Sequence, residues 1–209
     1  MRSSELTADR DRFVDAALRT LADHGAAELT VRRVAEAAES STMGIYSRFG
    51  SRAGLLEAVY DRGFTLLRAA LDKAPNGAPN DGPGGAGPEP VLALAATYRD
   101  FALANPALYA LLFERPIADF DPPPDLRRAA LERTLPLLTE RVAKVVPAAD
   151  PLRAAYLVWT AIHGMVSIEL THALRSPLPG WFLDSREAGA QALADGVRAT
   201  LAGLALNRT

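Results

Sequence analysis

Apolar residues recur along this chain at the spacing of one helix face, and polar residues and helix breakers divide the pattern into segments. From about residue 7 to 24, apolar side chains fall three or four positions apart, which predicts an amphipathic helix. Thr7 is suited to cap the start of this helix, and Gly25 is suited to end it. Its apolar stripe consists of Phe13, Val14, Ala17, Leu18 and Leu21.

Three more helices are predicted in the first third of the chain. A short helix follows Thr30, and a second runs from Ser41 to about Phe49. A long helix then begins at Ser51 and continues to about Lys73. The residues expected to be buried are Val31, Val34, Ala35 and Ala38 in the first of these helices, and Leu55, Leu56, Val59, Phe64, Leu67 and Leu71 in the last.

Residues 74–90 are almost purely Pro, Gly, Ala, Asn and acidic residues, which predicts a flexible connector. Beyond the connector, the same periodicity predicts helices at about 89–104, 106–114, 124–146, 151–175 and 184–206. Pro136 falls inside one of them and is expected to kink or split it. No segment has a convincing strand pattern, so the predicted fold class is all-α.

The composition excludes several kinds of protein. Nearly half of the 209 residues are hydrophobic, which predicts a folded chain. Cysteine is absent, so disulfides, thiolate zinc sites and cysteine nucleophiles are excluded. The charged start does not resemble a signal peptide, and no stretch approaches the roughly 20 apolar residues of a membrane span. We therefore expect a soluble cytoplasmic protein with no membrane partner.

The segment 30–49 has the features that a helix-turn-helix requires: a short helix, a tight turn and a second helix with a polar outer face. Ala35 is small where the two helices would cross, and Ile45 and Phe49 would hold the second helix to the core. Ser41 can cap that second helix, which would fit the major groove of DNA. Its residues available to a groove are Thr42, Met43, Gly44, Tyr46, Ser47 and Arg48.

The net charge of −2 gives no general indication of nucleic-acid binding, and arginines and acidic residues are equally numerous from Met1 to Leu56. Their placement differs, however, because the acidic residues gather in the first helix. The arginines at candidate DNA-facing positions are Arg32, Arg33, Arg48 and Arg52. DNA binding is therefore predicted from a few placed arginines.

Residues 10–56 resemble the tetracycline-repressor-like (TetR) family of transcriptional regulators. The matching runs are Phe13-Val-Asp-Ala-Ala-Leu, His24-Gly25, Leu29-Thr-Val-Arg-Arg-Val-Ala-Glu-Ala-Ala and Gly44-Ile-Tyr-Ser-Arg-Phe-Gly-Ser-Arg-Ala-Gly-Leu-Leu. The resemblance implies that Thr30 and Arg32 touch phosphates, that residues 42–44 lie near base edges, and that Tyr46 and Arg52 clamp the DNA backbone. The full set of predicted DNA-binding residues is Thr30, Arg32, Arg33, Ser41, Thr42, Met43, Gly44, Tyr46, Ser47, Arg48 and Arg52.

Two positions depart from the family pattern. Glu39-Ser40 stands where the family usually has Gly-Val, and a non-glycine residue in a left-handed turn costs on the order of 1 kcal/mol. Gly44 stands where a larger residue is common, and glycine loosens a helix by roughly 1 kcal/mol. We hypothesise that the recognition helix is marginally ordered without DNA.

The C-terminal half resembles one TetR subgroup. Residues 98–113 resemble the segment that lines the subgroup's effector cavity, and Trp159-Thr-Ala-Ile-His163-Gly164 matches its Trp-x-x-x-His-Gly signature. Trp159 and His163 are four residues apart and share a helix face. The alternative, which we favour for His163 alone, is a buried structural histidine bonded to a carbonyl. The candidates for a pocket that binds a small apolar or aromatic effector are Tyr98, Phe101, Leu108, Tyr109, Phe113, Trp159, His163 and Val166.

The predicted domains are a helix-turn-helix DNA-binding domain at 1–50, a connecting helix at 51–73, the flexible loop at 74–90 and a ligand-binding and dimerisation domain at 91–209. The resemblance implies a homodimer through helices at about 151–175 and 184–206. It further implies a repressor that a small molecule releases from an inverted-repeat operator in double-stranded DNA.

Other functions are less well supported by the sequence. The three histidines, His24, His163 and His172, are too dispersed to share a metal, and no nucleophile or phosphate-loop motif is present. We therefore expect no catalytic residue, metal or cofactor. A helical ligand carrier that has lost DNA binding stays open because of the departures at 39, 40 and 44. An ordinary helical hairpin at 30–49 is the remaining alternative.

Overall fold

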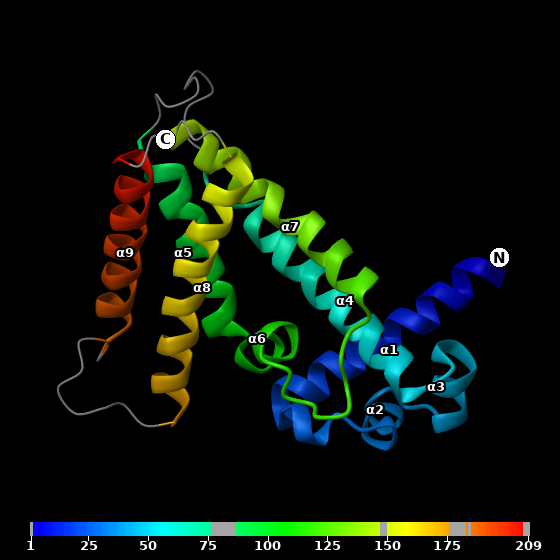
Figure 1. Ribbon diagram of the computed structural model, residues 1–209. Helices are drawn as coiled ribbons and strands as arrows, with labels where there is room; N and C mark the ends of the chain where they lie inside the picture. The colour runs from blue at the N-terminus through cyan, green and yellow to red at the C-terminus, as the bar shows by residue number, and fades with distance from the viewer. Residues whose placement is uncertain (1, 77–86, 147–149, 176–182, 184, 207–209) are drawn as a thin grey trace. The chain divides into compact units, whose positions relative to one another are not determined.

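The computed structural model describes residues 2–76, 87–146, 150–175, 183 and 185–206, and all the regular structure among them is helical (Figure 1). This confirms the predicted all-α class. Most of the predicted flexible connector, residues 77–86, lies outside the described residues. The helices are α1 (Arg2–His24), the 3₁₀ turn η1 (Ala26–Glu28), α2 (Val31–Ala37), α3 (Thr42–Phe49), α4 (Arg52–Leu71), α5 (Glu89–Ala104), α6 (Pro106–Phe113), α7 (Pro124–Val145), α8 (Pro151–Arg175) and α9 (Arg186–Leu206).

The ends of α1 agree with the sequence at one terminus only. The helix begins at Arg2 and continues through Thr7, so the prediction that Thr7 caps its start is wrong. Residues 2–6 contain neither glycine nor proline, so nothing there stops the helix from extending. Gly25 ends it as predicted, with φ at +80° and its N–H donating to the Leu21 carbonyl at 2.9 Å.

Contacts divide the chain into two compact units. Unit 1 consists of Met1–Leu66 and Asn105–Leu131, and unit 2 consists of Leu67–Ala104 and Glu132–Thr209. The sequence predicts that residues 105–131 belong to the C-terminal domain. In the structure they belong to unit 1, where α6 packs against α1 and α4. Gly63 of α4 permits this packing, because a Cβ there would lie within 3 Å of the Leu108 and Leu112 side chains.

The core of unit 1 lies where the apolar stripes of α1, α2, α3 and α4 meet. Phe13, Val34 and Ile45 are completely buried, which agrees with the inward faces predicted for the first three helices. Burying a side chain of this size contributes about 1.5–3 kcal/mol, so these contacts hold the short helices α2 and α3 in place. The core residues of α4 in this unit are Leu55, Leu56, Val59, Tyr60 and Phe64.

Unit 2 contains α5, α8 and α9 in mutual contact, together with parts of α4 and α7. Pro136 does not split α7, which runs unbroken from Pro124 to Val145. Pro136 is on the exposed side of the helix, where its ring meets solvent and only one backbone hydrogen bond is lost. In the described part of the chain, no helix is long and apolar enough to cross a membrane.

Candidate nucleic-acid interface

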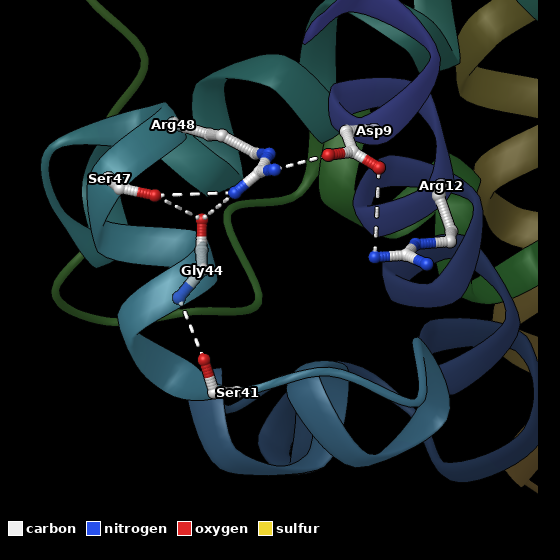
Figure 2. Close-up of polar contacts among 6 residues, drawn as sticks. All are labelled: Asp9, Arg12, Ser41, Gly44, Ser47 and Arg48. Carbon is white, nitrogen blue, oxygen red and sulfur yellow. Dashed lines mark hydrogen bonds and ion pairs between the residues drawn. The ribbon is translucent and has the colours of Figure 1, made fainter. Parts of the chain in front are cut away.

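Side chains cap both helices of the helix-turn-helix. The Thr30 hydroxyl accepts a hydrogen bond from the Arg33 N–H at 3.3 Å, and so caps α2. The Ser41 hydroxyl accepts from the Gly44 N–H at 3.1 Å and caps α3, as Figure 2 shows. Each bond satisfies an N–H that the helix itself leaves unpaired. The predicted starts of both helices are therefore confirmed.

The turn between α2 and α3 contains the strain that the sequence predicts. Glu39 has a φ of +50°, a left-handed conformation that favours glycine. The Glu39 N–H donates to the Glu36 carbonyl at 3.0 Å, and the Ser40 N–H donates to the Ala35 carbonyl at 2.9 Å. This pair of bonds is a Schellman motif, in which Glu39 occupies the position that is usually glycine.

The exposed face of α3 carries a mixture of polar and large apolar side chains. Met43 is 72% exposed and Tyr46 is 47% exposed, so both side chains are accessible on this face. Thr42 and Ser47 are also exposed, while Ile45 between them is completely buried. Hydroxyl groups can bond to base edges or phosphates, and apolar groups can contact thymine methyls.

Gly44 does not belong to that exposed face. A Cβ at Gly44 would lie 3.1 Å from Cζ of Phe13 in α1 and 3.1 Å from the Ser40 hydroxyl oxygen. The glycine therefore lets α3 approach α1 closely. This packing explains why position 44 is glycine. The explanation could not be predicted from the sequence, because Phe13 is 31 positions away in the chain.

The guanidinium of Arg48 points from α3 toward α1 (Figure 2). It forms an ion pair with Asp9 and donates a hydrogen bond to the Gly44 carbonyl at 3.1 Å. The Arg48 side chain is only 23% exposed. Although the sequence groups Arg48 with the groove-facing residues, its helix position turns it to the inner side.

The other three predicted DNA-facing arginines differ in their pairing. Arg33 forms an ion pair with Glu28 at 2.8 Å, and Arg52 forms one with Asp119 at 2.7 Å. For Arg32 the structure records no ion pair among the described residues, and its side chain is exposed. The carboxylates of Asp9 and Asp119 were not identified from the sequence because they lie 39 and 67 positions from their arginines.

Some of the predicted pocket residues meet in unit 2. The hydroxyl of Tyr98 lies 2.9 Å from Nδ1 of His163, and the Trp159 and His163 rings are 5.5 Å apart. The Tyr98 hydroxyl is thus one partner of His163, and the carbonyl partner considered from the sequence stays a prediction. Val166 is buried nearby along α8, and Phe101 is half-buried on α5.

The remaining predicted pocket residues belong to unit 1. The Phe113 ring packs edge-on against Phe64 of α4 at 5.6 Å, and Tyr109 lies 5.0 Å from Phe113. Leu108 of α6 lies close to Gly63 of α4. The eight candidates therefore fall into two groups in different compact units.

Unit 1 also contains a cavity of about 710 Å³ between α1, α4 and the start of α7, and none of the predicted pocket residues lines it. Its walls carry several charged side chains, unlike the apolar site expected for an aromatic effector. The charged lining residues are Arg10, Asp11, Glu57, Asp61, Arg62 and Asp125.

Buried charges in unit 2 have structural partners. Arg99 donates two hydrogen bonds to Glu169, at 2.7 and 2.5 Å, and the bond to this carboxylate raises the pKa of Arg99. Arg141 donates to the Ala74 carbonyl at 3.0 Å, and burial lowers its pKa. In unit 1, burial raises the pKa of Tyr60. Among the described residues, no group of three His, Asp or Glu side chains could hold a metal ion.

The fold and the exposed, capped α3 define a helix-turn-helix protein with a second helical unit. Residues 13–59 match the family described as bacterial regulatory proteins, tetR family. Residues 91–197 match the tetracyclin repressor-like C-terminal domain. The chain therefore belongs to the TetR family, whose members are DNA-binding transcriptional regulators rather than enzymes.

Relatives with known sequences and structures agree with this assignment. HTH-type transcriptional regulator Rv1816 of Mycobacterium tuberculosis is 27% identical over 139 residues, which are 66% of this chain and 58% of that protein. The chain thus spans less than two thirds of that relative. Regulatory protein SCO4313 has a similar fold, with a TM-score of 0.71 and 20% identity over 97% of this chain and 99% of that chain. The Streptomyces coelicolor TetR regulator SCO7222 has a TM-score of 0.62 and 22% identity, over 96% and 99% of the two chains.

Proposed function

We propose that this chain is a homodimeric, ligand-responsive transcriptional regulator that represses by binding an inverted-repeat operator in double-stranded DNA. The observation that carries the proposal is α3, a capped helix with an exposed polar and apolar face above a buried Ile45. A helix of this kind fits the major groove and reads base edges near its N-terminus.

The proposed contacts follow from exposure and charge. Thr42 and Met43 in the first turn of α3 would read base edges, while Tyr46 and Ser47 would contact the DNA backbone. Thr30 and Arg32 at the start of α2 would bind phosphates, and Arg33, Ser41 and Arg52 would add contacts around them. All of these side chains are exposed except that of Arg52, which is one third exposed, so each of them is accessible to DNA.

A homodimer is supported by exposed apolar residues on α8 and α9. Leu152, Tyr156 and Ile168 of α8 are each at least half exposed, and Leu152 and Tyr156, four residues apart, are neighbours on the helix surface. On α9, Leu206 is 85% exposed, and Gly203 has open space where a Cβ would stand. A two-fold pair also places two recognition helices about 34–36 Å apart, which matches successive major grooves.

The effector site is proposed around Tyr98, Trp159 and His163. The rings of Trp159 and His163 are neighbours, and the hydrogen bond between Tyr98 and His163 adds polar groups beside them. Aromatic side chains with a few polar groups commonly line small-molecule sites. This arrangement supports the proposal that the chain belongs to the Trp-x-x-x-His-Gly subgroup. Effector binding would favour a dimer whose recognition helices do not match the operator, with α4 as the lever because it contributes to both units.

The first experiment is selection of a preferred duplex from a random DNA pool with the full chain, followed by affinity measurements at several salt concentrations. A regulator is expected to bind an inverted repeat tightly and with a steep salt dependence. Arg32→Ala is expected to lower the salt slope by about one, whereas Arg153→Ala on α8 leaves it unchanged. Weak binding without sequence preference would instead support the ligand-carrier alternative.

The second experiment tests the effector response. A thermal-shift screen of small apolar and aromatic compounds is expected to find a compound that stabilises the full chain. By linkage, operator DNA must weaken binding of that compound by the same factor by which the compound weakens operator binding. Equal affinity for the compound with and without operator would contradict the proposed response to it.

A further inference from the structure

We propose that Asp9 and Arg48 form a brace between α1 and α3, and that Arg48 positions the recognition helix rather than contacting a phosphate. The inference rests on the proposed DNA-binding function, and it reassigns one residue that the sequence pattern groups with the groove-facing side chains of the second helix.

The donors of Arg48 are directed into the protein. Nη2 forms the ion pair with Asp9, and Nη1 donates to the Gly44 carbonyl at 3.1 Å and to the Ser47 hydroxyl at 3.3 Å (Figure 2). Nε is buried and has no hydrogen-bond partner. Arginine contacts phosphates through outward-facing donors, often two at once, whereas here Nη2 is directed to α1 and Nη1 back onto α3.

The surroundings of Arg48 explain why it lies on the inner side of α3. Its Cζ is 5.6 Å from the centre of the Phe13 ring, close enough for a cation–π contact. Gly44, one turn earlier on the same face, leaves the space that this ring occupies. The exposed side chains of Thr42, Met43 and Tyr46 lie on other faces, so the brace does not compete with them for DNA.

A second contact ties the same end of α3 to α1. Arg10 donates from Nη1 to the Arg48 carbonyl at 3.1 Å, which satisfies one of the unpaired carbonyls at the helix C-terminus. The Arg10 guanidinium also lies 4.6 Å from the centre of the Phe49 ring. A cation near a helix C-terminus is favourable, so adjacent residues of α1 hold both the side chain and the backbone of α3.

The two possible roles of Arg48 predict opposite effects for Asp9→Asn. If Asp9 withholds Arg48 from a phosphate, removing its charge frees the arginine and strengthens DNA binding. If the pair is a brace, the same substitution loosens α3 and weakens operator binding, even though it removes a negative charge from a DNA-binding unit. The sign of the change therefore separates the roles.

The test compares the selected operator with a random-sequence duplex, using the full chain at several salt concentrations. Asp9→Asn and Arg48→Lys are expected to weaken operator binding by roughly tenfold, the scale of one lost base contact. Random-sequence binding and the salt slope should stay nearly unchanged, because no phosphate contact is lost. Arg48→Lys keeps the charge but lacks the planar fork that reaches Asp9 and Gly44 together.

Asp11→Asn is the matched control. It removes the same charge from the same helix, and the structure records no ion pair for Asp11 among the described residues. Its operator affinity is expected to stay within about twofold of the unchanged protein, the screened effect of one exposed charge. The brace would be overturned if Asp9→Asn bound the operator as tightly as the unchanged protein or more tightly. It would also be overturned if Arg48→Gln lowered the salt slope by about one, because that would show a lost phosphate contact.

Amide hydrogen exchange tests the brace without DNA and guards against global unfolding. Asp9→Asn is expected to speed exchange in residues 42–49 while the core amides of α4 keep their protection. Unchanged exchange in α3 would overturn the brace. If the unchanged protein prefers no duplex, the proposed function fails, whereas operator binding that Asp9→Asn leaves intact contradicts the brace alone.

Discussion

At the scale of single residues, nearby carboxylates determine how much positive charge unit 1 offers to DNA. Arg33 and Arg52 are paired with Glu28 and Asp119, and all four side chains are at least one third exposed. Exposed ion pairs contribute only about 0–1 kcal/mol, so a DNA phosphate can replace either carboxylate. If Arg33 and Arg52 contact DNA as proposed, each carboxylate is expected to lower the DNA affinity without preventing binding.

Asp119→Asn is expected to strengthen DNA binding by roughly threefold at low salt, because Arg52 no longer has to leave an ion pair. The salt dependence should also become steeper. Both are measured by titrating the operator at several salt concentrations. Asp121→Asn in the same loop is the control, because Asp121 pairs with Arg115 and Arg127 rather than with a predicted DNA-binding residue. Equal gains in both variants would show that general charge, and not release of Arg52, is responsible.

Glu39→Gly is expected to stabilise the protein, because the residue has a φ of +50° in the turn between α2 and α3. Relief of the left-handed strain contributes on the order of 1 kcal/mol, and the greater freedom of glycine in the unfolded chain offsets part of it. We expect a net gain of about 0.5 kcal/mol in urea denaturation. Glu39→Ala removes the carboxylate but keeps the Cβ, so an equal gain there would identify charge as the cause.

At the scale of elements, the close packing of α3 on α1 outweighs the weak helix propensity of α3. Glycine at position 44 lowers that propensity, yet it admits the Phe13 ring, which is completely buried and has little room to move. The cap at Ser41 and the ion pair to Asp9 add to this packing. Marginal order of α3 in the absence of DNA stays a prediction, which the amide exchange of the unchanged protein tests.

Gly44→Ala is therefore expected to destabilise the protein by about 1 kcal/mol, even though alanine is the better helix former. The added methyl would stand 3.1 Å from the Phe13 ring and require it to shift. Thr42→Ala is the control, since it raises helix propensity at an exposed position of the same helix. Stabilisation by Gly44→Ala in thermal or urea unfolding would mean that propensity, and not packing, limits α3.

At the scale of the whole molecule, the proposed regulator depends on pairing of two chains. The exposed apolar residues of α8 and α9 are the surface that the homodimer would cover. A single α3 of eight residues reaches few base pairs, so loss of the proposed dimer is expected to remove most operator affinity while each chain stays folded.

Ile168→Arg is expected to convert the dimer to a monomer, because burying an unpaired charge costs several kcal/mol. Light scattering after size-exclusion chromatography measures the change, and operator affinity should fall by roughly a hundredfold or more. Leu131→Arg places the same charge at an exposed apolar position of α7 that belongs to unit 1, and should stay dimeric. An Ile168→Arg dimer would contradict the proposed interface.

Local features were predictable because they depend on residues within one helical turn. The caps at Thr30 and Ser41, the stop at Gly25 and the strained turn at Glu39 involve neighbours three to five positions away, whose spacing can be read from the chain. The buried stripe of each helix is local in the same sense. Thr7 is suited to cap a helix, yet it does not start α1, because the residues before it continue the helix back to Arg2.

The sequence by itself determined the helices, their order and the helix-turn-helix, because periodicity and capping act over a few residues. Only the tertiary structure decided that Arg48 turns to Asp9, that Arg52 meets Asp119 and that α6 packs with α1 and α4. Those contacts join residues far apart in the chain, and the folded core selects them among many charges and apolar side chains of the same kind. The residue types present at 9, 48, 52 and 119 permit other pairings, and the geometry of the folded chain selects among them.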